Sequence, residues 1–262
     1  LAEAAKLAAD HPDVRLFDAQ LRMASSDRKG AEAIVDSVLV KHPKNFEALA
    51  YKGRLLRDEG NATQALEIYD RMLRINPQHF QALVNRSVLS IGLGKLREAE
   101  NDVNALARVY KGHPQVHIQR GVLQLASGKP REALESAQLA LKSQPAPEAA
   151  HLLAGVAYLA TASPLQAEAA LTKYLSQVPG SPLGRRALAE SLIRRNEGAK
   201  ALETLAPLLH ASKPDPAAYA LAAEASVKAG RMTQASQWYE KAAASAPGDS
   251  SFDIRKALIR ID

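Results

Sequence analysis

The sequence predicts an all-α solenoid of helical hairpins that repeat every 34 residues. Three series of residues at this spacing support the prediction. Alanine recurs seven times without a break, at Ala31, Ala65, Ala99, Ala133, Ala167, Ala201 and Ala235. A second series holds only small residues, at Ala19, Gly53, Ser87, Gly121, Gly155, Ala189, Ala223 and Ala257. A third holds residues of the kind that ends a helix in the left-handed conformation, at Gly60, Gly94, Gly128, Ala162, Asn196 and Gly230.

The composition of the chain supports helices over strands. Hydrophobic residues make up 47% of the 262 residues but aromatic residues only 5%, and alanine and leucine supply most of the apolar content. No apolar run reaches the roughly 20 residues that a membrane span needs. The absence of cysteine excludes disulfides and thiolate metal sites.

Each repeat is predicted to hold four elements in a fixed order. A first helix carries the small residue, a Gly or Asn turn follows, and a second helix carries the alanine. A connection then leads to the next repeat, marked at Pro43, Pro77, Lys111, Pro145, Pro179, Lys213 and Pro247. Gly155 costs its helix about 1 kcal/mol relative to alanine. We expect this cost to be offset by close approach of the two helices, with the small residue facing the alanine.

Larger apolar residues are predicted to fill the space between the helices. On the second helices these are the pairs Val35/Val38, Tyr69/Met72, Val103/Leu106, Leu171/Tyr174 and Leu205/Leu208.

This pattern resembles the tetratricopeptide repeat (TPR), which implies a right-handed superhelical solenoid. We expect one solenoid over residues 1–262, with full repeats at 12–45, 46–79, 80–113, 114–147, 148–181, 182–215 and 216–249. Residues 1–11 and 250–262 read as partial repeats. Because the chain begins at Leu1 and neither end offers a polar capping helix, we expect a part of a longer array.

The second half has a narrower resemblance. HLLAGVAYLATASPLQAEAALTKYLSQVPGSPLGRRALAESLIRRNEGAKALETLAPLLHASKPDP is similar to the TPR lipoproteins of PEP-CTERM/exosortase systems, including Pro207 inside a second helix, where it should kink that helix. The resemblance implies a periplasmic scaffold for exopolysaccharide export and protein sorting. It also implies a tether to the outer membrane through an upstream lipid anchor outside this chain.

The residues give little support to chemistry. His113 and His117 are four apart, but His113 precedes Pro114 and no carboxylate completes a metal site, so we expect no metal. The sequence also offers few convergent polar groups of the kind that catalysis needs. We therefore expect no cofactor and no enzyme activity. GLGK at 92–95 lacks the spacing of a phosphate-binding loop. Basic pairs at Arg185/Arg186 and Arg194/Arg195 lack aromatic neighbours, so we expect no nucleic-acid partner despite the net charge of +6.

A partner surface is expected where the first helices line a groove. The helical period predicts an apolar centre with charged flanks, suited to a protein or peptide segment that is apolar in its middle. The candidate residues are Arg54, Arg57, Val84, Val88, Ile91, Ile118, Val122, Leu125, Leu152, Val156, Leu159, Arg186, Glu190 and Arg194. The alternative is that packing between helices buries the apolar residues. Asn85 matches one place of the clamp that holds acidic tails in TPR co-chaperones, but the other places do not match, so Asn85 is better explained by a bond between helices.

The predicted function is a non-enzymatic protein-interaction scaffold of an extracytoplasmic exopolysaccharide or exosortase system. A cytoplasmic TPR adaptor and direct polysaccharide binding remain alternatives. The sequence leaves the oligomeric state open.

Overall fold

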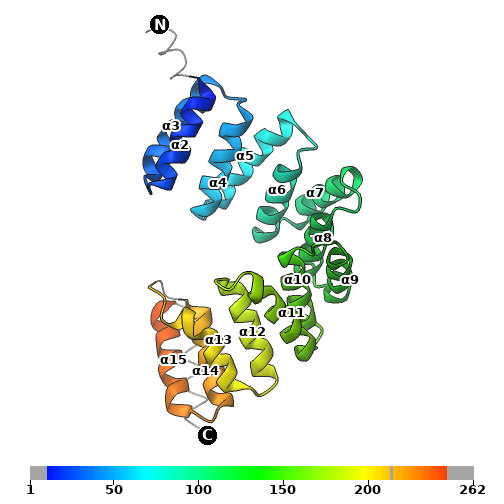
Figure 1. The fold of residues 1–262 in the computed structure, drawn as a ribbon, viewed down its shortest axis with the longest axis vertical. Helices are drawn as coiled ribbons and strands as arrows, with labels where there is room; N and C mark the ends of the chain where they lie inside the picture. Colours follow the sequence, from blue (N-terminus) through cyan, green and yellow to red (C-terminus); the bar gives the residue numbers. More distant parts are fainter. Residues whose placement is uncertain (1–10, 213–214, 247–262) are drawn as a thin grey trace. The chain divides into compact units, whose positions relative to one another are not determined.

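The computed structural model describes residues 11–212 and 215–246, and within these ranges every regular element is an α-helix. The helices alternate as first and second members of hairpins (Figure 1). Their bounds are α2 (Pro12–Ala24), α3 (Arg28–Lys41), α4 (Phe46–Asp58), α5 (Ala62–Ile75), α6 (Phe80–Gly92), α7 (Leu96–Val109), α8 (Pro114–Ala126), α9 (Pro130–Leu141), α10 (Glu148–Ala160), α11 (Pro164–Gln177), α12 (Pro182–Arg194), α13 (Gly198–Leu209), α14 (Pro216–Lys228) and α15 (Met232–Ser245). None of the described helices combines the length and the apolar character needed to cross a bilayer.

The chain forms two compact units, one up to Ala126 and one from Ser127. The first contains α2 to α8 and the second α9 to α15. In each unit, consecutive helices in the sequence pack against each other, as in α4 with α5 and α14 with α15. The all-α solenoid prediction is therefore confirmed. The predicted helices before Pro12 and after 249 lie outside the described residues, as do Lys213, Pro247 and Ala257.

The turn series behaves as predicted. All six residues have positive φ, from 55° at Ala162 to 80° at Gly60, and Ser26, one repeat earlier, has a φ of 66°. These turns reverse the chain between the two helices of a repeat. Several first helices begin at polar caps: the side chains of Asn45, His79 and Asp215 accept a hydrogen bond from a backbone N–H of the first turn.

The alanine series forms the middle of the core, because all seven alanines are fully buried. The five predicted pairs of large residues on the second helices are buried as well. Such burial on one face of every helix explains why short helices of modest propensity are stable in the array.

The partner of the small residue differs from the prediction. A Cβ on Gly155 would lie closest to Leu171, and one on Gly53 would lie closest to the ring of Tyr69. In both repeats the nearest side chain is thus one helical turn beyond the series alanine, Ala167 or Ala65. Large residues of the second helix, rather than the alanines, fill the space that these glycines leave. Pro207 lies inside α13, which continues to Leu209.

Candidate partner-binding surface

The first helices of the first unit share two rows of side chains at equivalent places. One row consists of Gln20, Arg54, Val88 and Val122, and the other of Met23, Arg57, Ile91 and Leu125. We call these eight residues the first-helix face. Gln20, Arg54, Arg57 and Val88 are exposed, and the other four are half-buried. The face is therefore basic on α4 and apolar on α6 and α8.

A hollow of about 350 Å³ opens between α2 and α4 at the basic end of this face. Its lining residues are Gln20, Met23, Tyr51, Arg54, Leu55 and Asp58. The guanidinium of Arg54 lies 5.1 Å from the centre of the Tyr51 ring, and the hydroxyl of Tyr51 donates a hydrogen bond to the carbonyl of Ala19. Burial raises the pKa of Tyr51, with Arg54 opposing the rise, so the ring stays neutral. No ion pair of Arg54 occurs among the residues described, which leaves its charge available to a ligand.

Arg57 is held more firmly than Arg54. Its guanidinium pairs with Asp58 at 3.1 Å and donates to the side-chain oxygen of Asn85 on α6 at 3.4 Å. Gln81 donates to the same oxygen at 3.2 Å. Asn85 is buried and joins α4 to α6, which confirms the prediction that it bonds between helices.

Two of the predicted apolar contacts in this unit are not accessible. Val84 and Ile118 are buried in the packing of the first helices, which is the alternative that the sequence left open. Val88, by contrast, exposes 44% of its surface, and Ile91, Val122 and Leu125 are partly exposed. The exposed apolar strip of this unit is therefore shorter than the sequence predicts, because it lacks Val84 and Ile118.

The charged side chains of the second unit are paired mostly with one another. Leu159 is buried, and Leu152 and Val156 are partly buried against the core cluster that contains it. Arg186 pairs with Asp215 at 3.1 Å, while Arg194 pairs with Glu190 and donates to the carbonyl of Leu159 at 2.7 Å. The predicted charged flank of this unit is therefore engaged mostly within the unit.

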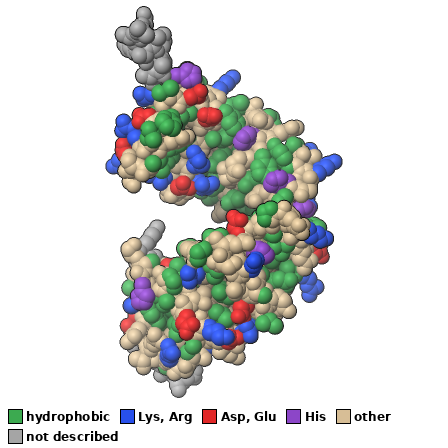
Figure 2. Space-filling model, viewed as in Figure 1, with side chains coloured by type: hydrophobic (Ala, Val, Ile, Leu, Met, Phe, Trp, Pro, Cys, Tyr) green, Lys and Arg blue, Asp and Glu red, His purple; other side chains and the backbone are tan. Residues whose placement is uncertain are grey.

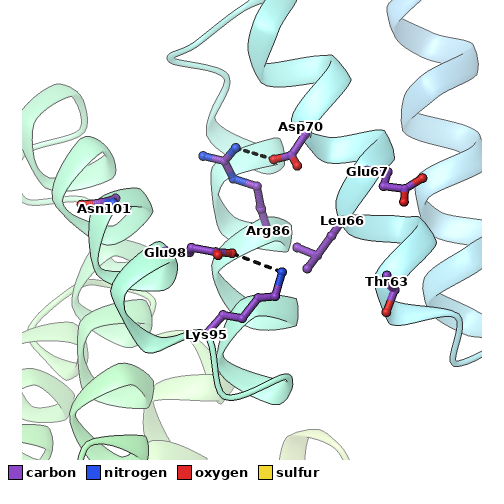
Figure 3. A pocket seen from close by; sticks show the side chains of 8 residues that line it. All are labelled: Thr63, Leu66, Glu67, Asp70, Arg86, Lys95, Glu98 and Asn101. Carbon is purple, nitrogen blue, oxygen red and sulfur yellow. Dashed lines mark hydrogen bonds and ion pairs between the residues drawn. The ribbon is translucent and has the colours of Figure 1, made fainter.

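A different hollow lies among α5, α6 and α7, on the side of the second helices (Figure 3). It has a volume of about 370 Å³ and charged walls that contain Glu67, Asp70, Glu98, Arg86 and Lys95. Arg86 reaches Asp70 at 2.7 Å, and Lys95 reaches Glu98 at 3.6 Å. The first of these ion pairs joins α5 to α6, and the second joins residues three apart in the sequence.

Arg86 also pairs with Asp102 on α7, which is the buried member of this ion-pair network. Arg86 contacts both of its carboxylate oxygens, with 2.9 Å between Arg86 Nε and Oδ2. Burial raises the pKa of Asp102, and the hydrogen bonds from Arg86 oppose that rise. The same carboxylate hydrogen bonds raise the pKa of Arg86 above its ordinary value. We interpret the network as a structural link that holds α6 to α5 and α7.

The partly buried histidines are explained by helix capping and packing. His79 caps α6, accepting from the N–H of Ala82 at 3.2 Å, and lies 4.5 Å from the ring of Phe46. Burial lowers the pKa values of His79, His117 and His151. In the described part of the chain, no three histidine, aspartate or glutamate side chains gather as a metal would require.

Acidic and basic side chains are interspersed over the visible face of each unit (Figure 2). Such mixing is typical of a solvated surface and differs from the one-sided basic stripe of nucleic-acid-binding proteins.

Comparison with known families decides the classification. Two sequence profiles described as tetratricopeptide repeat match residues 19–80 and 118–182, and residues 56–121 and 163–224, so that together they cover residues 19–224. The chain belongs to the tetratricopeptide repeat family. TPR proteins generally act as protein-interaction scaffolds, and the fold is typically non-enzymatic.

Solved TPR structures agree with this classification at the level of the fold. A TPR protein from Parabacteroides merdae ATCC 43184 is 19% identical with a TM-score of 0.70, over 95% of this chain and 98% of that one. PilF of Pseudomonas aeruginosa is 16% identical with a TM-score of 0.63, over 81% and 97%. YrrB, described as a TPR protein with an unusual peptide-binding site, is 14% identical with a TM-score of 0.55, over 72% and 98%. No curated protein sequence matches the chain.

Several residues of the hollow between α2 and α4 are not among those that the sequence pattern predicts. Gln20 and Met23 stand one repeat before Arg54 and Arg57, so the 34-residue spacing could have found them. The contribution of Tyr51 could not be read from spacing, because its ring position depends on how α4 packs against α2.

Proposed function

We propose that this TPR protein is a peptide-binding scaffold whose first-helix face in the first unit holds an extended or helical segment of a partner protein. The observation that supports this most is the exposed apolar side chain of Val88 on α6, one repeat after the exposed Arg54 on α4. Arg54, with no carboxylate partner among the described residues, suits an acidic residue of the ligand. Val88 and the half-buried Ile91 suit apolar residues that follow it. The ligand is thus a segment with acidic residues beside an apolar stretch.

The charge distribution on the first-helix face determines which end of the bound segment lies over which helix. The basic residues lie on α4, while the apolar residues lie on α6 and α8. An acidic end over α4 and an apolar end over α6 and α8 satisfy both. The reversed order would place carboxylates over apolar side chains and leave Arg54 without a partner.

The test compares two substitutions of the same type in the same unit. Val88→Glu changes the first-helix face, whereas Val40→Glu changes an exposed valine on α3, away from that face. With each variant as bait, proteins are recovered from envelope and cytoplasmic fractions of the source cells. A partner kept by wild type and Val40→Glu, but lost by Val88→Glu and by Arg54→Glu, supports the proposal. A partner retained by all variants would contradict it.

We further propose that the setting is extracytoplasmic, in a system for exopolysaccharide export or exosortase sorting. The support is the resemblance of residues 151–216 to TPR lipoproteins of those systems. Recovery of the protein in the periplasmic and outer-membrane fractions would support this setting. Recovery in the cytoplasm would instead favour the TPR adaptor alternative, and a partner captured there would identify its target.

A further inference from the structure

The connections between repeats in the first unit form one continuous edge. Arg71 on α5 donates a hydrogen bond to the carbonyl of Pro43 in the α3–α4 connection, at 2.9 Å. One repeat on, the hydroxyl of Tyr110 at the end of α7 donates to the carbonyl of Gln78 in the α5–α6 connection, at 2.8 Å. The end of a second helix is thus tied to the connection before it. We call Arg71 and residues 40–46, 74–80 and 108–114 the connection edge.

The charged side chains of the connection edge are all basic: Lys41, Lys44, Arg71, Arg74, Arg108 and Lys111. Its three connections contain no aspartate or glutamate. The turns within the hairpins of the same unit, in contrast, contain Asp27, Asp58 and Glu59. The corresponding connections of the second unit, 142–148 and 176–182, have Lys142 as their single basic residue. Positive charge therefore gathers at one edge of the first unit.

Most of these cations are available to a ligand. Lys44, Arg74, Arg108 and Lys111 are exposed and form no ion pair with a described residue. A hollow of about 600 Å³ opens between the α3–α4 connection and the end of α5, and its lining residues are Pro43, Lys44, Arg71, Arg74 and Ile75. The hollow thus has three cationic side chains and no carboxylate.

The helix dipole explains only part of this charge. A basic residue in the last turn of a helix is favoured by the dipole, which accounts for Lys41, Arg74 and Arg108. Lys44 and Lys111 lie beyond the helix ends, so the dipole of their own repeat does not require them. A role outside helix stability is therefore open to the connection edge.

Exposed aliphatic side chains lie among the cations. Val40 is 81% exposed, the highest value among the large apolar side chains that the structure describes. Ile75 and Val109 are 43% and 42% exposed, and each directly follows an arginine of the edge in the sequence. Cations mixed with exposed aliphatic groups are typical of surfaces that bind anionic membranes, because headgroups attract the charge and the acyl boundary takes up the apolar groups.

A protein partner fits this edge less well than a membrane does. Protein interfaces generally depend on aromatic side chains that the partner can cover. The rings of Phe46 and Phe80 on this edge are half-buried and already packed, against His79 at 4.5 Å and Tyr110 at 4.8 Å. What remains exposed is aliphatic and basic.

We propose that the connection edge docks on the surface of an anionic lipid membrane. Lys44, Arg71 and Arg74 hold a lipid phosphate in the hollow between them. Val40 and Ile75 enter the boundary between headgroups and acyl chains. The contact is peripheral and uses folded residues of the repeats themselves.

Vesicle cosedimentation of the complete chain tests the proposal. The chain should bind vesicles that contain phosphatidylglycerol and should not bind vesicles of phosphatidylcholine alone. Binding should weaken as the salt concentration rises from about 0.1 M to about 1 M, because the Debye length falls from about 10 Å to about 3 Å. Arg74→Glu combined with Arg108→Glu should weaken binding at least about 20-fold, since each cation near an anionic surface contributes about fivefold.

The matched control changes the same amount of charge at the other end of the second helices. Lys29 and Arg97 are exposed near the starts of α3 and α7 and form no ion pair with a described residue. Lys29→Glu combined with Arg97→Glu should weaken vesicle binding far less than the edge variant does. Circular dichroism of each variant checks that the fold is kept. Val40→Glu, at a side chain that packs little, gives a second edge variant and should also weaken binding.

Three results would overturn the proposal. The first is failure to bind phosphatidylglycerol vesicles, and the second is equal weakening by the edge and control variants, which would mean that net charge alone is responsible. The third is an acidic protein that the edge variant fails to capture from cell extracts while wild type binds no vesicles, which would make the edge a protein-binding surface.

This proposal and the proposed function fail separately. Val88→Glu on the first-helix face should lose the partner protein and keep vesicle binding. Val40→Glu should keep the partner protein and bind vesicles more weakly.

Discussion

Gly155 on α10 packs so closely against Leu171 on α11 that a single carbon added to the glycine would overlap the leucine side chain. A Cβ on Gly155 would lie 2.4 Å from Leu171 Cγ and 2.6 Å from its Cδ2. Leu171 is fully buried, so its side chain cannot swing into solvent. The glycine therefore determines how closely α10 and α11 approach, and the leucine determines that it must be glycine.

Gly155→Ala should lower the free energy of unfolding by about 1–3 kcal/mol, even though alanine is the better helix former. Overpacking against Leu171 outweighs the gain in propensity. The measurement is chemical denaturation followed by circular dichroism. Gly92→Ala provides the control, because Gly92 lies in α6 and a Cβ added there would meet nothing within 4 Å, so this substitution should be neutral or stabilising. Equal effects of the two substitutions would contradict the packing argument.

The repeat spacing predicts the hairpins, the turns and the buried alanine series, since each depends on residue type at a fixed place. It does not predict which side chain meets Gly155. That depends on the angle between α10 and α11, which the pairing of small residues with alanines does not specify. The closest neighbour is Leu171, one turn past Ala167.

Ala162→Gly should stabilise the protein by roughly 0.5–1 kcal/mol. Ala162 has a φ of 55°, a conformation that penalises a Cβ, whereas four equivalent turns have glycine. The same substitution at Ala169, exposed within α11, should destabilise by about 1 kcal/mol, because a helix interior disfavours glycine. Thermal and chemical denaturation would separate the two effects. A loss of stability in Ala162→Gly would show that the turn is not strained.

The candidate site is less predictable than the fold. The helical period places Val84 and Val88 on the same side of α6, yet Val84 is buried and Val88 is exposed. The difference depends on how deeply neighbouring first helices pack, which spacing alone does not give. Arg194 is similar: its type suggests a free charge, but Glu190 and the carbonyl of Leu159 engage it.

Stability should fall as the pH drops below about 6.5, the ordinary value for histidine. Burial lowers the pKa of His79, so the folded protein favours the neutral ring while the unfolded chain takes up a proton first. Neutral Nδ1 also accepts the capping hydrogen bond from Ala82, which protonation removes. Unfolding free energies measured between about pH 5 and pH 7.5 should therefore rise with pH.

His79→Asn tests whether His79 contributes to the dependence of the unfolding free energy on pH. Asparagine is a good cap without a titrating ring, so the variant should keep the cap, worth about 1 kcal/mol, and show a shallower slope. A slope remains because the pKa values of His117 and His151 are also lowered. If the slope were unchanged, His79 would not contribute to it.

Asp102→Ala should cost about 3 kcal/mol of unfolding free energy, because it leaves the charge of Arg86 without its buried partner. Asp102 is 1% exposed and receives two hydrogen bonds from Arg86. Asp70 contacts the same guanidinium, but its side chain is 47% exposed, so Asp70→Ala should cost less than about 1 kcal/mol. Replacing Arg86 and Asp102 together with methionine and leucine should recover much of the loss, since no charge is then left buried. Denaturation of the three variants beside wild type measures these differences. Equal losses for Asp102→Ala and Asp70→Ala would mean that burial does not set the strength of this network.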